Sequence, residues 1–511
     1  DTPCQRNRPQ MKSMLASIDI GAHSARLLIV QVDKSSGTYE TIEDLEIPVP
    51  LGADVFRTGR IGNKSVAMLC EIMKKFSFKM REYRIKEYCA IATSAVREAE
   101  NADIFLERIK FLSGIDVKIF TGPDEARLGY LAVQSVIPAN FHFEEQSLLL
   151  ADIGTGACQV SMFDHGIMCF TETIKLGTLR AVEGFSDASA AAARIEQLEP
   201  VIDYAFSELE YLSRKMNCTG LIVTGASSRA MLAMKKQRIK RGMFELKVEE
   251  FRQLRQIAGS HTVEALGREY NIKSDLAEAV LPCCMMISNL LKLTGAKMIY
   301  APTISTKYAL IEDFINSSMH RRDPFEPQIF GCATQIAERY ASDMRLIAST
   351  VILAEKLFAK LAPLHGMGHE ELKLLKVAAL LYKTGLFVNN QAYHKHSHYI
   401  ILNTEIPGIS QAERRIVAMV ARYHRKAVPK PQHLDYMALP VEERHVISKL
   451  AAILRLACGL AVICKPDERM TVKISSGLVM VKIGGMGRSA GFDCIDTDMF
   501  NYAFASKIIF L

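Results

Sequence analysis

The sequence predicts an α/β protein of two related lobes followed by a mostly helical domain. Strand-like and helix-like segments alternate between residues 15 and 315, which is typical of α/β architecture. An apolar strand that ends in Asp-Ile-Gly occurs twice, at Asp19 and at Asp152. Beyond residue 319 the strand pattern gives way to long amphipathic helical stretches.

The composition is that of a chain with several globular domains. The 511 residues leave room for about three domains of roughly 100–200 residues each. Hydrophobic residues make up 49% and charged residues 23%, so several cores can form and disorder is excluded as the main state. The net charge of +7 suits an anionic ligand and is too small to indicate a nucleic-acid partner, which we do not expect.

The cysteines and the N-terminus indicate a cytoplasmic protein. No Cys-x-x-Cys occurs among the 12 cysteines, so free thiols are expected in place of a zinc ribbon or a secreted disulfide framework. Residues 1–13 are polar and lack the apolar core of a signal peptide, which predicts a flexible tail. No stretch reaches the roughly 18 uncharged apolar residues of a membrane span, and we expect no membrane partner. The closest stretch, 450–464, contains Arg455 and is expected to form a buried helix.

The first lobe is expected over residues 14–140. Its pattern opens with two apolar strands around a glycine turn and continues with helices and strands in alternation. The expected strands cover 15–20, 25–32, 87–92 and 117–121, and the expected helices cover 64–81, 102–113 and 124–136.

The second lobe is expected over residues 141–318 and repeats the opening of the first. Segments 17–33 and 150–164 both read as an apolar strand, Asp-Ile-Gly, a turn of small residues and a second apolar strand. The expected elements of the second lobe are strands at 148–153, 159–164 and 220–224 and a long helix at 189–216. This internal repeat predicts two halves with the same local topology.

The repeated Asp-Ile-Gly turns favour a phosphate site. An Asp that ends a buried strand beside a glycine turn places a carboxylate next to exposed backbone N–H groups, which can hold a phosphate and its divalent metal. The alternative is that Asp and Gly simply end two strands, since both residue types favour turns. Neither a Walker A loop nor a Gly-x-Gly-x-x-Gly turn occurs at a strand–helix junction, which excludes a P-loop NTPase and a nicotinamide enzyme.

The third region, residues 319–511, is expected to be helical with a small β tail. The segment 319–327 carries two prolines and several charges, and it is expected to form the domain boundary. The expected helices cover 328–340, 343–361, 369–381, 410–423 and 441–461. From Met470 the sequence returns to a strand-like alternation.

Several motifs in a fixed order resemble one family. Two Asp-Gly hairpins in duplicated halves resemble the actin/Hsp70/sugar-kinase superfamily, which has ribonuclease H-like lobes. Five motifs narrow the resemblance to the exopolyphosphatase/guanosine-pentaphosphate phosphohydrolase (Ppx/GppA) family: ATSAVREAENADIFLERI (92–109), TGPDEARLGYLAV (121–133), DIGTGACQV (152–160), Lys175-Leu176-Gly177 and RYHRKAVP (422–429). The resemblance covers roughly residues 15 to 465.

The resemblance implies hydrolysis of a terminal phosphate from polyphosphate, or of the 5′ γ-phosphate from guanosine pentaphosphate, with Mg²⁺. It implies that Asp19 and Asp152 hold the metal and that Glu125 activates the attacking water. Arg97 and Gln159 are the other catalytic candidates that it implies. The substrate-binding candidates are Gly21, Ser24, Thr93, Ser94, Gly154, Thr155, Gly156, Lys175, Arg422, Arg425 and Lys426. A homodimer is the expectation for the family.

Elementary chemistry agrees with these roles and leaves alternatives for two of them. Phosphoryl transfer needs charge neutralisation and an in-line nucleophile more than covalent help. Arg97 can form two bonds to phosphate oxygens, and the alternative is that it faces solvent beside Glu98 and Glu100. Glu125 can orient or deprotonate water, and the alternative is that it complements the dipole of a helix in its first turn.

The second loop departs from the family pattern. Where family members carry Gly, Ser and Glu, this chain has Thr155, Ala157 and Gln159. Gln159 can orient water but cannot act as a base, and Ala157 lacks a hydroxyl donor for phosphate. A binding or sensing protein with impaired hydrolysis is therefore the alternative to a hydrolase. A kinase-like transferase would need an adenosine pocket, for which the chain shows no convincing Gly-Gly turn.

The helical region resembles an HD domain that lacks its metal dyad. The dyad position reads Tyr382-Lys383, and Ala461 stands near where another Asp would be expected. His394, His396 and His398 alternate along the chain, and we expect a surface or phosphate-facing cluster; a Zn²⁺ or Ni²⁺ site is the alternative. The basic segments that could serve a polyanion are 235–241, 321–322 and 422–426.

Overall fold

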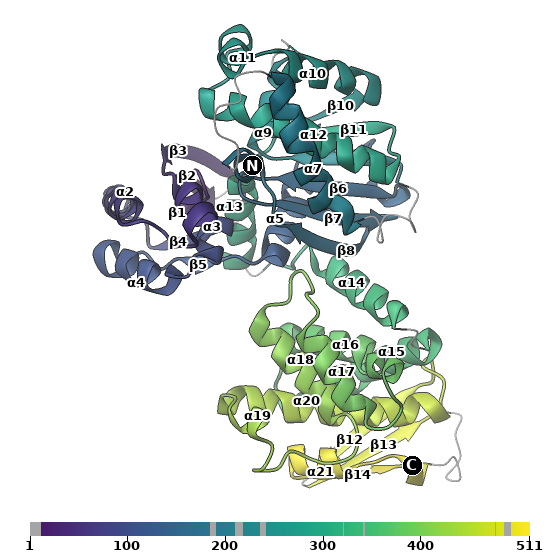
Figure 1. The fold of residues 1–511 in the computed structure, drawn as a ribbon. Helices are drawn as coiled ribbons and strands as arrows, with labels where there is room; N and C mark the ends of the chain where they lie inside the picture. The colour runs from purple at the N-terminus through teal and green to yellow at the C-terminus, as the bar shows by residue number, and fades with distance from the viewer. Residues whose placement is uncertain are drawn as a thin grey trace, which may run out of the picture. The chain divides into compact units, whose positions relative to one another are not determined.

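The chain divides into two compact units in a computed structural model. Unit 1 is Asp1–Phe325 and unit 2 is Glu326–Leu511 (Figure 1). The structure describes residues 12–183, 191–209, 218–235, 242–319, 321–340, 343–475, 477–484 and 492–511. Residues 1–11 of the expected tail lie outside this part. Lys12 and Ser13 belong to the first strand, so the expectation of a tail is wrong for them.

The first sheet of unit 1 has five strands in the order β3-β2-β1-β4-β5. They are β1 (Lys12–Ile20), β2 (Ser24–Asp33), β3 (Tyr39–Pro48), β4 (Glu87–Ala92) and β5 (Lys118–Ile119). β1 pairs antiparallel with β2 and parallel with β4. Four of these strands lie where the sequence predicts them, and β3 was not predicted because its alternation is mostly exposed.

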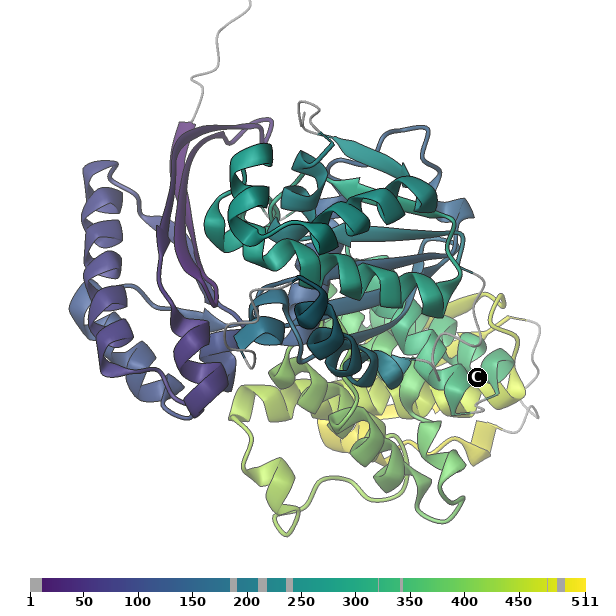
Figure 2. The ribbon, with the colours of Figure 1, turned by 45° about the horizontal axis from the view of Figure 1, so that its top comes forward.

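Helices cover both faces of this sheet. The helices of this lobe are α1 (Leu51–Thr58), α2 (Asn63–Glu82), α3 (Ser94–Glu98) and α4 (Ala102–Ser113). One face packs Ile18 and Leu27 against α2 and α4, which lie on one side of the purple strands in Figure 2. The other face packs Leu15 and Val30 against α13 (Thr306–Ser318). This double burial explains the apolar runs within β1 and β2, such as residues 27–30.

The second sheet repeats the first. Its order is β10-β11-β9-β6-β7-β8. The strands are β6 (Leu148–Ile153), β7 (Cys158–Asp164), β8 (Ile167–Ile174), β9 (Gly220–Thr224), β10 (Met243–Lys247) and β11 (Met298–Pro302). β6 pairs antiparallel with β7 and parallel with β9, as β1 does with β2 and β4. The predicted α/β fold with duplicated lobes is confirmed.

The helices around the second sheet bury an extensive apolar core. They are α5 (Gly122–Gln134), α6 (Thr178–Glu183), α7 (Ala191–Ser207), α9 (Ala226–Ala233), α10 (Val248–Ser260), α11 (Val263–Tyr270) and α12 (Ser274–Thr294). The helix expected at 189–216 corresponds to α7 within the described residues. The 11 cysteines that the structure describes are free thiols, as expected.

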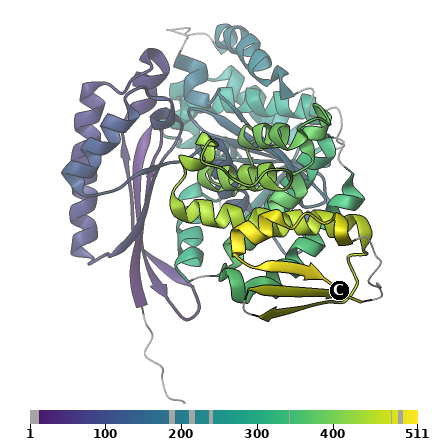
Figure 3. The ribbon, with the colours of Figure 1, turned by 90° about the horizontal axis from the view of Figure 1, so that it is seen from below.

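Unit 2 is helical and ends in a small sheet. Its main helices are α14 (Glu326–Arg339), α15 (Met344–His365), α16 (His369–Leu381), α17 (Tyr393–Leu402), α18 (Gln411–Tyr423) and α20 (Val441–Ile463). The three strands β12 (Met470–Ser475), β13 (Leu478–Ile483) and β14 (Lys507–Phe510) lie side by side near the C-terminus (Figure 3). The five helices predicted here are all present, with ends that differ by a few residues.

Among the described residues, two helices are long and apolar enough to cross a membrane. They are Leu276–Thr294 in α12 and Val441–Ile463 in α20, and 67% and 61% of their apolar windows are buried. Such burial is equally typical of core helices in globular proteins. In α20, Arg455 is buried and donates hydrogen bonds to the carbonyl oxygens of Tyr423 (2.9 Å) and Lys426 (3.0 Å). The prediction of a buried helix around Arg455 is confirmed.

Candidate active site

The first candidate loop joins β1 to β2. The amide of Gly21 donates to the carbonyl oxygen of Ser24 (2.9 Å), which closes the turn directly after Asp19. Asp19 lies opposite Arg26 in the antiparallel register, and Arg26 Nη1 lies 3.2 Å from Asp19 Oδ2. Arg26 Nε also donates to Glu46 Oε1 (2.9 Å) on β3. The hairpin register therefore sets a carboxylate beside a cation at the mouth of this loop.

The second loop has the same turn. The amide of Gly154 donates to the carbonyl oxygen of Ala157 (3.0 Å), as Gly21 does to Ser24. Asp152 is the next-to-last residue of β6, and its Oδ1 accepts a hydrogen bond of 2.7 Å from Thr224 Oγ1 on β9. Burial raises the pKa of Asp152, and this hydrogen bond opposes the rise. The repeat in the sequence thus corresponds to a repeat of backbone geometry.

Both loops open into one cavity of about 970 Å³ in unit 1. Ten of the predicted residues line it: Asp19, Gly21, Ser24, Thr93, Ser94, Glu125, Asp152, Gly154, Thr155 and Gly156. Residues more than 100 positions apart in sequence therefore meet around a single space, as a ligand site requires.

Glu125 lies in the first turn of α5, and Arg97 holds it. Thr121 and Asp124 form a capping box that fixes the start of this helix. Arg97 Nη1 donates to Glu125 Oε1 and to the carbonyl oxygen of Phe120 (2.6 Å). Burial raises the pKa of Glu125 to about 7, although the Arg97 charge opposes the rise. A carboxylate with this pKa can exchange a proton near neutral pH.

Arg97 is held by contacts with other residues of unit 1. Its side chain is 20% exposed, so it does not simply face solvent. Its contacts are with Glu125 and the chain before α5, and it is not among the residues that line the cavity. The direct contact of Arg97 with phosphate stays a prediction. In this structure Arg97 holds Glu125, which lines the cavity.

Gln159 is buried below the site and has its own partners. Its Nε2 donates to Thr171 Oγ1 (2.5 Å), and its Oε1 accepts from Thr173 Oγ1 (2.6 Å), both on β8. A Cβ on Gly122, at the start of α5, would lie 3.2 Å from this Oε1. Gln159 is not among the cavity-lining residues and lies under the start of α5, and its catalytic role stays a prediction.

Lys175 is exposed and does not line the cavity, but its segment supports the second loop. Thr178 donates its amide to the carbonyl oxygen of Gly154 (3.0 Å). A Cβ on Gly177 would lie 2.4 Å from the carbonyl group of Thr155, so only glycine permits this approach. The Lys-x-Gly motif therefore has a structural role here.

The sequence reasoning missed four cavity cations. They are Arg26, Arg229, Lys273 and Lys307. The position of Arg26 opposite Asp19 was a usable signal. Arg229 donates to the carbonyl oxygen of Ile304 (2.9 Å), and burial together with nearby Arg26 lowers its pKa. Lys273 directly precedes α12 and Lys307 lies in the first turn of α13, and no local sequence pattern connects either residue to the cavity.

The cavity suits a divalent metal with a phosphate ligand. Its lining carboxylates are Asp19, Glu46, Glu125 and Asp152, which balance the four cations in formal charge. Hydrogen bonds of the described residues engage Oδ2 of Asp19 and Oδ1 of Asp152, so the other oxygen of each carboxylate is available as a metal ligand. Mg²⁺ commonly binds through one or two carboxylates, water and substrate phosphate. These residues fit that pattern.

The basic and histidine-rich predictions of the helical region fall in unit 2. Arg422 lies in the last turn of α18 and Arg425 and Lys426 follow the helix, and all three stay predictions as substrate contacts. Arg425 lies 4.6 Å above the ring of Tyr393. In the first basic segment, residues 236–241 lie outside the described residues.

The three histidines of the cluster differ in burial. His394 and His398 are buried on one face of α17, whereas His396 is half-buried. No group of three or more His, Cys, Asp or Glu that could hold a metal occurs in the described part of the chain. At the dyad position, Tyr382 is buried, and its ring lies 4.9 Å from that of His424.

Comparisons with known proteins agree with this fold. A crystal structure of an exopolyphosphatase from Cytophaga hutchinsonii matches with a TM-score of 0.54 and 22% identity, over 60% of this chain and 98% of that one. The Aquifex aeolicus member of the Ppx/GppA family matches with a TM-score of 0.51 and 19% identity, over 60% and 99%. A guanosine-5′-triphosphate,3′-diphosphate pyrophosphatase of Pseudoalteromonas translucida is 25% identical over 431 residues, 83% of this chain and 82% of that protein.

The duplicated lobes with paired Asp-Gly loops define a protein of the actin/Hsp70/sugar-kinase fold class with a cavity between these loops. The Ppx/GppA phosphatase family model matches residues 28–321, and the model of domain III of the Ppx/GppA phosphatases matches residues 331–474. The chain belongs to the Ppx/GppA phosphatase family.

Proposed function

We propose that this protein hydrolyses the terminal phosphate of polyphosphate, or the 5′ γ-phosphate of guanosine pentaphosphate, with Mg²⁺. The observation that carries the proposal is the meeting of Asp19, Glu125 and Asp152 around one cavity. Two carboxylates suit a metal, and a third with a pKa of about 7 suits a base. The related guanosine-5′-triphosphate,3′-diphosphate pyrophosphatase and exopolyphosphatase support both substrates.

The chain's own residues would bind the phosphate and move one proton. Amides of the two glycine turns and the cavity cations, including Arg26 and Arg229, surround the anion. Glu125 orients a water and takes its proton while the water oxygen bonds to phosphorus. The bond from phosphorus to the bridging oxygen breaks, and that oxygen leaves with the shortened chain. A bound Mg²⁺ would neutralise charge on the phosphate oxygens.

A phosphate-release assay tests this proposal. Polyphosphate and guanosine pentaphosphate are offered separately with Mg²⁺, and wild-type protein is compared with Glu125→Gln. Release above the Glu125→Gln level is expected for at least one substrate. Absence of such release with both substrates would refute the hydrolase proposal, and the relative rates identify the preferred substrate.

A binding or sensing protein with impaired hydrolysis is the second candidate. It is favoured by the contacts of Gln159, whose amide is occupied by two threonine hydroxyls and carries no base. Isothermal titration with both anions distinguishes it. Tight binding without phosphate release supports sensing. Phosphate release by the wild type above the level of Glu125→Gln supports the hydrolase.

The remaining properties are proposals of the same kind. We propose that the protein is a cytoplasmic homodimer without a nucleic-acid or membrane partner. The reason for the dimer is that pairing would extend a basic channel, such as Arg422–Lys426, across two subunits. Light scattering after size exclusion tests the dimer. A mass of one chain, 56.9 kDa, would contradict it.

A further inference from the structure

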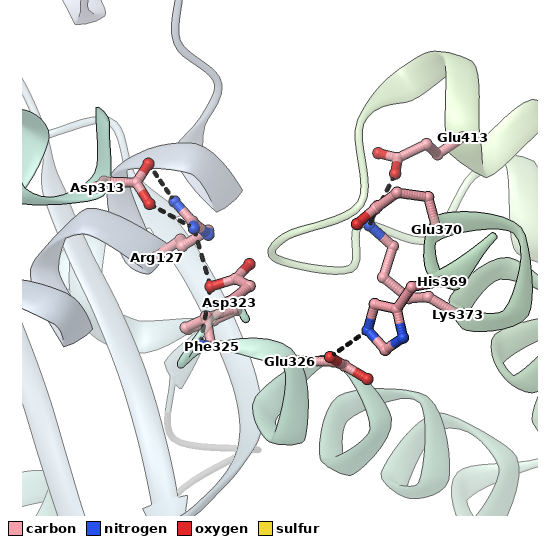
Figure 4. Close-up of polar contacts among 9 residues, drawn as sticks. All are labelled: Arg127, Asp313, Asp323, Phe325, Glu326, His369, Glu370, Lys373 and Glu413. Carbon is pink, nitrogen blue, oxygen red and sulfur yellow. Dashed lines mark hydrogen bonds and ion pairs between the residues drawn. The ribbon is translucent and has the colours of Figure 1, made fainter. Parts of the chain in front are cut away.

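Arg127 lies two residues after Glu125 on α5 and contacts two acidic residues. Its Nη1 and Nη2 each lie 2.7 Å from an oxygen of Asp313, and Nη2 lies 3.0 Å from Asp323 Oδ1 (Figure 4). Its side chain is only 17% exposed. Residues two apart on a helix project about 200° apart, so Arg127 points away from Glu125. A guanidinium that binds one carboxylate with both nitrogens has a defined orientation.

The two acidic partners come from different parts of unit 1. Asp313 is on α13, which packs against α5 through apolar residues such as Leu128 and Leu310. Asp323 belongs to the segment between α13 and the end of unit 1. Arg127 therefore joins the helix that carries Glu125 both to a neighbouring helix and to the segment that continues into unit 2.

This segment has a second attachment to α5. Asp323 Oδ1 accepts a hydrogen bond from the amide of Phe325 (2.9 Å), which fixes the local turn. Phe325 is fully buried, and its ring packs edge-on against Tyr130 of α5 at 5.3 Å. Arg127 and Tyr130 are three residues apart and so lie on the same face of α5. The segment 323–325 is thus held along one face of this helix.

No linker residues separate this attachment from the first helix of unit 2. Glu326 follows Phe325 directly, starts α14 in unit 2 and is buried. Within unit 2, Glu326 Oε2 lies 2.8 Å from His369 Nε2 on α16 (Figure 4). Two buried residues are therefore adjacent in sequence at the division between the units. A displacement of the chain here cannot be absorbed by free residues before it reaches Arg127.

At its start, α5 is held by the capping box and by the contact between Arg97 and Glu125. We propose that Arg127, Asp313 and Asp323 form a positioning network. Through this network, the path of the segment that enters unit 2 determines the position of α5 and therefore the position of Glu125. Its catalytic consequence depends on the proposed hydrolase function, whereas the coupling between the segment and α5 does not.

The test uses the full chain with matched variants. Asp323→Asn keeps the size of the side chain and removes its charge, and Arg127→Lys keeps the charge but loses the bidentate geometry. Asp116→Asn is the control, because the pair between Lys110 and Asp116 (3.1 Å) is also in unit 1 but exposed and away from α5. Amide hydrogen exchange over residues 122–134 and hydrolysis kinetics are measured for each.

Asp323→Asn and Arg127→Lys are expected to increase exchange in α5 about three- to tenfold, with no change in Asp116→Asn. If the wild type hydrolyses either substrate, kcat should fall by a similar factor while KM stays within about twofold. Unchanged exchange in α5 in both variants, or a uniform increase across unit 1, would overturn the network. If the wild type releases no phosphate, the proposed function fails, and the exchange data still decide the coupling.

Discussion

Arg26 and Gln159 occupy the same position in the two halves of unit 1. Arg26 lies between Asp19 on β1 and Glu46 on β3 in the strand register. Gln159 lies in the same way between Asp152 on β6 and Thr173 on β8. Asp19, Arg26 and Glu46 are charged and line the cavity. In the second half the corresponding middle residue, Gln159, is neutral and buried. The duplicated fold therefore presents two chemically different halves to one ligand space.

Replacing Gln159 by Glu restores a carboxylate beside Asp152. Thr173 already donates to this side chain, whereas Thr171 accepts from it and would have to give up its hydrogen bond to the carbonyl oxygen of Val160 to donate, so the buried charge would be partly satisfied. We expect kcat for phosphate release to rise about tenfold if the missing carboxylate limits turnover. Gln159→Leu is the comparison variant that removes both hydrogen bonds. An unchanged or lower kcat in Gln159→Glu would show that this residue has a structural role only.

Glu125→Gln should abolish most turnover while ligand binding persists. A positioned base contributes about 10²- to 10⁴-fold, so kcat should fall by that range. In the wild type, kcat/KM should rise as pH increases through about 7, where Glu125 loses its proton. This limb should vanish in Glu125→Gln. The control is Glu107→Gln on the exposed face of α4, which should keep both the rate and the limb.

The raised pKa of Glu125 also affects stability. Burial moves this pKa from 4.5 to about 7, so the folded state holds a proton that the unfolded state has lost. The wild-type free energy of unfolding should therefore fall relative to Glu125→Gln as pH rises from 4.5 to 7, by about 3 kcal/mol. Urea titrations without Mg²⁺ at pH 5 and pH 8 measure this difference. Equal differences at both pH values would contradict the assignment.

Thr224→Val removes the hydroxyl that donates to Asp152 and keeps the shape of the side chain. Without this hydrogen bond the pKa of Asp152 should rise further, which opposes metal binding. We expect the Mg²⁺ concentration for half-maximal rate to increase several-fold, since a second-sphere contact is lost. Thr334→Val on α14 serves as the control. An unchanged Mg²⁺ dependence would argue against Asp152 as a metal ligand.

Gly177→Ala tests the close approach to the second loop. The new methyl group would lie 2.4 Å from the carbonyl group of Thr155, so the loop must shift. We expect destabilisation of about 1–3 kcal/mol and a higher KM, measured by urea unfolding and initial rates. Gly368→Ala in unit 2 is the matched control, because its methyl group would meet nothing closer than 3.7 Å. Equal stability of both variants would refute the steric role.

Much of the fold could be predicted because its signals are local. The apolar strands ending at Asp19 and Asp152 and the five helices of unit 2 follow from side-chain periodicity. β3 and β8 were missed because each is only partly buried and its alternation is weak. The boundary was placed within 319–327, and the units divide after Phe325 because the buried contacts change partners there.

By itself the sequence determined the duplicated α/β architecture, the family and ten residues of the cavity wall, because strand ends, glycine turns and ordered motifs are written in contiguous segments. Only the tertiary structure decided that Arg97 contacts Glu125, that Gln159 lies beneath α5 and that Arg229 joins the cavity. These relationships depend on which side chains meet when distant segments pack, and burial then sets their pKa values and partners. Local patterns carry no information about such distances.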